Sequence, residues 1–220
     1  MQNVVTVKRF WRWHVDLTHP EYVILGENRA RVLHRLAVLA EPTSGRRIHE
    51  LSGARALRTT QRVLDELVTI GLVDVQKLGS ANAYLLNRKH LLWRPIEEIL
   101  AIHAIAASAI DEAIRDALSG SVTSAAIYGS LARGEAGPES DIDVIVVWPD
   151  ETAKEDGHSV VDSLGESVRR LTGNQLQALV VTQAELARLV EHDDPLVDSI
   201  RRDGVTVVGV DIASLLGVRR

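Results

Sequence analysis

The side chains best suited to chemistry lie within residues 125–147. Gly129 and Ser130 follow a short apolar stretch, and Asp141 and Asp143 stand two residues apart where a second apolar stretch begins. A glycine lets the backbone turn sharply and approach a ligand closely. Because successive side chains of a strand point to opposite faces, two aspartates at this spacing share one face.

A buried pair of carboxylates is unfavourable without a cation. The two charges repel each other and lose hydration. Mg²⁺ relieves that cost and also binds phosphate oxygens. A Gly-Ser turn that opens a helix presents backbone N–H groups to an anion. An anion-binding turn beside a carboxylate pair therefore predicts a site for Mg²⁺ and a nucleoside triphosphate, as in-line phosphoryl transfer requires.

The elements that would position these residues follow from the local pattern. Residues 125–128 predict a short strand, Ser130 opens a helix that runs through Arg133, and residues 134–140 form a Gly/Pro loop. Residues 141–147 are almost wholly apolar after the first few positions, as in a buried strand. Further along, the pattern predicts strands at 176–181 and 205–208 and helices at 184–190 and 195–202.

The stretch resembles the signature of the DNA polymerase β nucleotidyltransferase superfamily, in particular its minimal bacterial members. Every fixed position of that signature is present: Gly129, Ser130, Arg133, Gly134, Ser140, Asp141 and Asp143. The resemblance implies a mixed β-sheet with helices. It also implies that Asp141 and Asp143 are catalytic and bind Mg²⁺. The nucleotide-binding residues it implies are Gly129, Ser130, Arg133 and Ser140.

The sequence departs from that family at one position. The family normally carries a third carboxylate on a following strand, which helps to hold the metal or acts as general base on the attacking hydroxyl. Here Gln177 or Gln175 stands where this acid is expected. Either another acid such as Glu139 or Glu185 substitutes, or the acceptor supplies its own activation, or the site binds nucleotide without turnover.

The two halves of the chain differ in charge. Residues 1–95 carry 15 Lys and Arg against 8 Asp and Glu, a net charge of +7, whereas residues 96–220 carry 10 against 22, a net charge of −12. A basic segment favours contact with nucleic acid, and an acidic segment disfavours it. The division predicts two domains with different tasks.

Three helices and a hairpin are predicted in the basic half. The first helix begins at Asn28 and is ended by Pro42. The second is short, is capped by Thr43 or Ser44 and runs toward Leu51, and the third covers residues 55–70. The two strands of the hairpin are residues 72–75 and 83–86. This order resembles the winged helix-turn-helix family over about residues 28–90. In that family the third helix enters the major groove and the hairpin contacts the DNA backbone.

The winged-helix resemblance implies double-stranded DNA as a partner and a role in transcription regulation. The residues that it assigns to DNA contact are Arg46, Arg47, Arg55, Arg58, Thr59, Arg62 and Lys77. The alternative is that these charges form the solvated face of a protein-binding winged helix. The cluster Lys8–Trp13 mixes cations with aromatic rings, either as an arm that touches nucleic acid or as a packed segment.

The predicted protein is α+β and has three parts. Residues 1–94 form the winged-helix domain with its N-terminal arm, residues 95–119 a linker helix that begins at Pro95, and residues 120–220 the nucleotidyltransferase domain. The apolar stripe of the linker helix offers a surface for a homodimer.

Composition narrows the classes of protein. The chain has no cysteine, which excludes disulfides and thiolate metal sites. It shows no apolar run long enough for a membrane span and no signal-peptide core, so a cytoplasmic protein without a membrane is expected. Two functions fit: an enzyme that transfers a nucleoside monophosphate to a hydroxyl acceptor, or a transcriptional regulator whose nucleotidyltransferase fold binds nucleotide without catalysis. A toxin–antitoxin role follows from family analogy alone.

Overall fold

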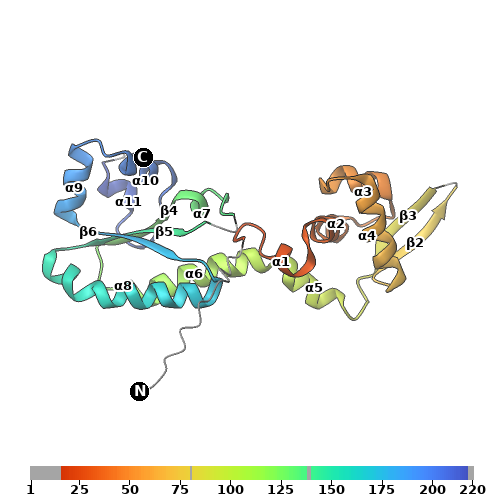
Figure 1. Cartoon of the computed structure of the whole chain (residues 1–220), viewed down its shortest axis with the longest axis horizontal. Coiled ribbons are helices and arrows are strands. Elements are labelled where there is room, and N and C mark those ends of the chain that lie inside the picture. Colours follow the sequence, from red (N-terminus) through yellow and green to blue (C-terminus); the bar gives the residue numbers. More distant parts are fainter. Residues whose placement is uncertain (1–15, 80, 138–139, 218–220) are drawn as a thin grey trace, which may run out of the picture. The chain divides into compact units, whose positions relative to one another are not determined.

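A computed structural model of the chain describes residues 16–79, 81–137 and 140–217. It divides into two compact units (Figure 1). Residues 19–105 form the N-terminal unit, and residues 106–220, with the segment that ends at Thr18, form the C-terminal unit. The predicted arm at Lys8–Trp13 lies outside the described residues. Among the helices that are described, none is both long enough and apolar enough to cross a membrane.

The N-terminal unit combines helices with a small antiparallel sheet. Its helices are α1 (Glu21–Leu25), α2 (Glu27–Val38), α3 (Gly45–Ser52), α4 (Leu57–Thr69) and α5 (Trp93–Leu100), and its strands are β1 (Thr43–Ser44), β2 (Val73–Leu78) and β3 (Ala81–Leu86). The strand order is β1-β3-β2. The hairpin predicted after the third helix is confirmed as β2 and β3, which pair directly.

Local chemistry accounts for where these helices begin and end. The side chain of Ser44 accepts a hydrogen bond from the backbone N–H of Arg47 at 3.3 Å, which caps α3 as expected. The prediction that Pro42 ends α2 is wrong, because Leu39 already adopts an extended conformation. The third helix begins at Leu57, so Arg55 precedes it. The sequence pattern missed β1, which is too short to show any alternation.

The single helix predicted to begin at Pro95 is two helices, and the first of them, α5, already begins at Trp93. α5 ends at Leu100, and α6 (Ile102–Leu118) follows after Ala101. The backbone N–H of Ala101 is shared between the carbonyls of Glu97 and Glu98, as is common at a helix end. The apolar spacing is continuous across this point, so periodicity did not reveal the break.

The C-terminal unit is built on a four-stranded mixed sheet. Its further elements are β4 (Ser124–Tyr128), α7 (Gly129–Ala132), β5 (Ile142–Trp148), α8 (Glu151–Thr172), β6 (Leu176–Thr182), α9 (Gln183–Glu191), α10 (Pro195–Asp203), β7 (Val205–Gly209) and α11 (Ile212–Leu215). The strand order is β6-β5-β4-β7, with β5 and β6 parallel and the other pairs antiparallel. The predicted mixed sheet is confirmed.

Helices cover both faces of this sheet. Ile142, Val144 and Val146 of β5 pack on the face that α6 and α8 cover, and Ile145 and Val147 pack on the face of α9, α10 and α11 (Figure 1). Burial on both faces explains the continuous apolar run of β5. Because side chains alternate along a strand, Asp143 shares its face with Ile145 and Val147.

Candidate functional site

The predicted carboxylate pair stands where β5 begins. Asp141 directly precedes this strand and Asp143 is its second residue. Asp143 is in register with Tyr128 of β4 on one side and with Gln177 of β6 on the other. The Gln177 side chain donates a hydrogen bond from Nε2 to Oδ2 of Asp141 at 2.7 Å. Both carboxylates and this amide therefore lie together at one end of the sheet.

The ionised form of Asp143 is disfavoured in this position. Burial raises the pKa of Asp143, the charge of Asp141 raises it further, and the charge of Arg133 opposes them. Burial, with a smaller contribution from Asp143, also raises the pKa of the neighbouring Tyr128. The repulsion expected for two adjacent carboxylates is thus present, and a cation between them would relieve it.

The turn at Gly129 lies directly against the Asp143 carboxylate. Gly129 has a φ of 74°, which side-chain-bearing residues rarely adopt. A Cβ atom at this position would overlap Oδ2 of Asp143. Glycine is therefore required both by the backbone conformation and by the space, and the structure brings Gly129, Asp141 and Asp143 together.

Ser130 belongs to the single turn α7 that follows. The backbone carbonyl of Ser130 accepts from the N–H of Glu135 at 2.9 Å, and that of Gly129 accepts from the N–H of Arg133 at 3.2 Å, so the chain folds back after α7. A helix of one turn has only a small dipole. Any anion here would depend on individual N–H groups, because those of a first turn lack intrahelical partners.

Arg133 ties the loop after α7 to the end of α10. Its Nε donates to Glu135 at 2.7 Å, and its Nη1 donates to Oδ2 of Asp203 at 2.6 Å. The Asp203 side chain is only 3% exposed and also pairs with Arg202. Hydrogen bonds from Arg202, and then from Arg133, lower the pKa of Asp203. Arg133 thus supports the loop, and its positive charge also acts to lower the pKa of Asp143.

Ser140 shapes the chain just before the carboxylate pair. Its hydroxyl oxygen accepts from the backbone N–H of Gly137 at 3.0 Å. Its carbonyl accepts from Nδ2 of Asn174, a fully buried side chain, also at 3.0 Å. These bonds give Ser140 a structural task in the loop that leads into β5.

The position expected for a third carboxylate is held by Gln177. Glu185, a predicted substitute, follows Thr182, which pairs with Trp148 at the opposite end of β5. Thr182 lies five positions beyond Gln177 along β6, which corresponds to about 16 Å. Glu185 instead completes a capping box and binds Lys154 at 2.6 and 2.7 Å. Glu139 lies outside the described residues.

No third acid joins the pair from elsewhere in the described chain. Over residues 16–79, 81–137 and 140–217, no group of three or more His, Asp or Glu side chains is arranged to hold a metal ion. Among the described residues, Asp141 and Asp143 therefore form a pair without a third acid, and the amide of Gln177 lies beside them.

The arginines predicted to contact DNA are exposed in the N-terminal unit, but most of them have an acidic neighbour. Their pairs are Arg46 with Glu50 (3.3 Å), Arg47 with Glu50 (3.4 Å), Arg55 with Glu27 (3.5 Å) and Arg62 with Glu66 (3.9 Å). Within the described residues, Arg58 has no such ion pair. Thr59 is half-buried on α4, and Lys77 is exposed on β2. Their contact with DNA stays a prediction.

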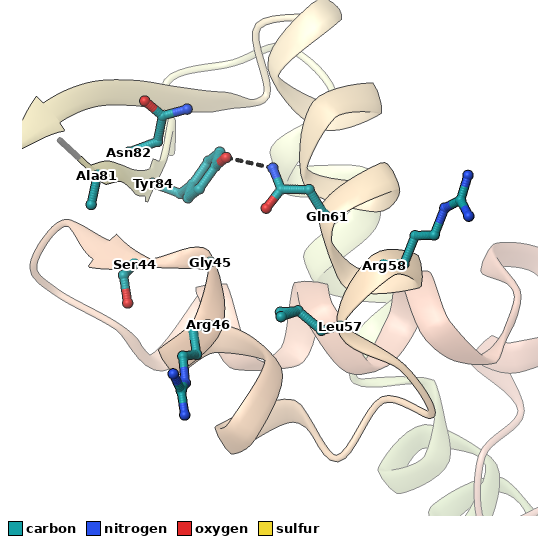
Figure 2. Close-up of a pocket in the computed structure, with 9 residues that line it drawn as sticks. All are labelled: Ser44, Gly45, Arg46, Leu57, Arg58, Gln61, Ala81, Asn82 and Tyr84. Atoms are coloured by element: carbon teal, nitrogen blue, oxygen red, sulfur yellow. Dashed lines mark hydrogen bonds between the residues drawn. The ribbon is translucent and has the colours of Figure 1, made fainter.

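A pocket of about 770 Å³ lies between α3, α4 and β3 of this unit (Figure 2). Gln61 and Tyr84 point toward one another across it, and the Gln61 amide donates to the Tyr84 hydroxyl at 2.7 Å. Gly45 packs against both, since a Cβ there would lie 3.1 Å from Oε1 of Gln61. Arg46 and Arg58 also line the pocket. The sequence did not reveal this pocket, because its walls come from separate elements.

Residues 108–200 match the family described as a nucleotidyltransferase domain. The match covers less than half of the chain and includes β4, α7 and β5, so the predicted resemblance of this stretch is confirmed at the level of the domain. A solved structure described as "Crystal structure of the toxin-antitoxin with AMP-PNP" is similar at 16% identity over 50% of this chain and 79% of that chain, with a TM-score of 0.33. A TM-score this low does not establish a common fold. None of the curated proteins matches the sequence.

The ion pair of Glu185 generates a pH-dependent prediction. Hydrogen bonds from Lys154, and then from the Thr182 backbone, lower the pKa of Glu185. The pair therefore stabilises the fold above the pKa that Glu185 has in the unfolded chain, and this contribution is lost as pH falls through the folded-state pKa. We expect Glu185→Gln to lower the free energy of unfolding by about 1 kcal/mol or less at pH 7.

Urea unfolding of both proteins at pH 7 and at pH 3 measures this difference. The two stabilities should converge in acid. A deficit in Glu185→Gln that is equally large at both pH values would show that packing, and not charge, accounts for it.

Proposed function

We propose that the C-terminal unit binds a nucleoside triphosphate together with Mg²⁺ and transfers its nucleoside monophosphate to a hydroxyl acceptor. One observation carries this proposal: the Gly129 turn lies against the Asp143 carboxylate, with Asp141 alongside. The match of residues 108–200 to nucleotidyltransferase domains supports it.

Asp141 and Asp143 are the residues that would hold Mg²⁺. Proteins commonly bind this ion through one or two carboxylates, and substrate phosphates supply further oxygens. The donor set here fits that pattern, because burial and the neighbouring charge of Asp141 make the ionised form of Asp143 costly without a cation. When bound, Mg²⁺ would neutralise phosphate charge and orient the phosphates for in-line displacement.

The chain's remaining task is to position the nucleotide. Without a side chain at Gly129, phosphates can approach the backbone N–H groups of the turn next to Asp143. Arg133 and Ser140 keep this loop in place through their contacts with Asp203 and Gly137.

The transfer itself exchanges two bonds at the α-phosphorus. The acceptor oxygen forms a bond to this atom, the bond to the oxygen that bridges toward the β-phosphorus breaks, and pyrophosphate leaves. The acceptor must also lose a proton, which an amide such as Gln177 cannot accept. Because no third acid among the described residues joins the pair, this proton would pass to solvent, to a base that the acceptor brings, or to Glu139, which lies outside the described residues.

The amide of Gln177 favours a second candidate function, nucleotide binding without transfer. With Gln177 in the place of the third acid, the site keeps the residues for binding, but the described residues place no third carboxylate there to act as a base. The C-terminal unit would then bind a nucleotide without transferring it, and the chain would act as a regulator that responds to the nucleotide.

For the N-terminal unit we propose binding of double-stranded DNA by a winged helix. The order of α2, α3 and α4 followed by the β2–β3 hairpin supports this assignment. Arg58 is the arginine best placed to act on DNA, because it is exposed on α4 and no acidic side chain of the described residues pairs with it. Glu50 and Glu66 would compete with DNA phosphates for Arg46, Arg47 and Arg62.

The carboxylate pair can be tested directly. We expect Asp141→Asn combined with Asp143→Asn to reduce pyrophosphate release from the preferred nucleoside triphosphate roughly a hundredfold or more, because the charge that holds the metal is gone. Release is measured with each of the four triphosphates and Mg²⁺. Asp162→Asn, which removes an exposed charge on α8, serves as the control and should keep full activity.

Each outcome separates the functions. Release that disappears only in the double variant supports transfer. Nucleotide binding without release from any triphosphate supports the regulator, and wild-type binding of no nucleotide would contradict both.

The DNA proposal predicts an order among the arginine variants. We expect Arg58→Ala to weaken duplex binding by about 1–3 kcal/mol if it contacts a base. Arg62→Ala should have a smaller effect because Glu66 already neutralises part of its charge. Fluorescence anisotropy with mixed-sequence duplexes over a range of salt concentrations measures both variants. Arg94→Ala, which removes an exposed arginine of α5, is the control. Duplex affinity that Arg58→Ala leaves unchanged would refute the placement of Arg58 on the DNA-binding surface.

A further inference from the structure

Gln177 stands where the carboxylate pair would take a third acidic ligand. It is in register with Asp143 across the parallel strands β5 and β6. Its amide nitrogen donates to Oδ2 of Asp141 at 2.7 Å, a short hydrogen bond to a charged acceptor. Gln177 therefore engages one oxygen of the pair and adds no negative charge.

This arrangement decides how strongly the pair attracts a free ion. Two carboxylates carry a formal charge of −2, whereas a glutamate at position 177 would bring it to −3. Mg²⁺ gives up its water reluctantly and is usually bound by carboxylates together with substrate phosphates. A pair with one oxygen already hydrogen-bonded competes weakly with water for the ion. A triphosphate supplies the missing oxygens and charge.

We propose that Gln177 is a positioning residue that makes divalent-ion binding at Asp141 and Asp143 conditional on the nucleoside triphosphate. Ion and nucleotide enter the site as one complex, and the ion alone binds weakly. This inference rests on the proposed nucleotide-binding function. It gives the amide a task in both candidate functions, because the site then responds to the metal–nucleotide complex and not to the free ion.

The variants separate charge from hydrogen bonding. Gln177→Glu adds the third carboxylate, and Gln177→Met keeps the length of the side chain but removes the amide donor. Gln183→Glu is the matched control, since it adds the same charge away from the pair. Gln183 is the first residue of α9, directly after the end of β6 that lies farthest from Gln177, and its amide donates to Thr123. Gln177→Asp replaces Gln177→Glu if thermal unfolding shows that the glutamate variant does not fold.

Isothermal titration calorimetry of the full chain with Mn²⁺ measures ion binding with and without non-hydrolysable analogues of ATP and GTP. We expect the wild type to bind Mn²⁺ tightly only when an analogue is present. Gln177→Glu should bind Mn²⁺ alone at least tenfold more tightly than the wild type, which corresponds to about 1.4 kcal/mol. Gln177→Met, which frees Oδ2 of Asp141, should bind Mn²⁺ alone more tightly than the wild type but less tightly than Gln177→Glu, and Gln183→Glu should still need the analogue.

Three results would overturn the role of Gln177: no gain in Mn²⁺ affinity in Gln177→Glu, an equal gain in Gln183→Glu, or tight binding of Mn²⁺ alone by the wild type. The proposed function fails separately, if the wild type binds neither analogue in the presence of Mn²⁺. Normal analogue binding without a gain in Gln177→Glu would remove only the role assigned to the amide.

Discussion

The close approach of the Gly129 backbone to the Asp143 carboxylate is the constraint on which the C-terminal unit depends. The antiparallel register of β4 and β5 sets Tyr128 beside Asp143, and the next residue turns the chain directly over the carboxylate. No side chain fits between them. In the proposed function, a phosphate that follows the turn meets the carboxylate pair, and a cation offsets the like charges. The proposed binding of metal and nucleotide rests on this one contact.

The parts of this site that were predictable are local in sequence. Asp141 and Asp143 share a strand face because side chains alternate, and Gly129 ends the preceding apolar strand. The support for the loop was not predictable, because Arg133 reaches Asp203, which is 70 residues away and carries no pattern of its own. The parallel register of β5 and β6 was not predictable either, because it exists only in the folded sheet. This register sets Gln177 beside the carboxylate pair and Glu185 far from it.

In the N-terminal unit, periodicity and capping predicted α3, α4 and the hairpin, since each is defined by neighbouring residues. The net charge of this half was less informative about its surface. Glu50 forms ion pairs with both Arg46 and Arg47. A count of charges along the sequence does not show which side chains pair in this way. Helix geometry decides which arginines lie next to an acidic side chain. Among the arginines predicted to contact DNA, Arg58 differs because no acidic side chain of the described residues pairs with it.

A crystal structure of the full chain with Mn²⁺ and a non-hydrolysable nucleoside triphosphate tests the central claim most directly, because anomalous scattering locates the ion independently of the protein. We expect an anomalous peak in contact with both Asp141 and Asp143, with the triphosphate against the N–H groups of Gly129 and Ser130. A nucleotide bound elsewhere on the chain, or an ion that touches neither carboxylate, would contradict it.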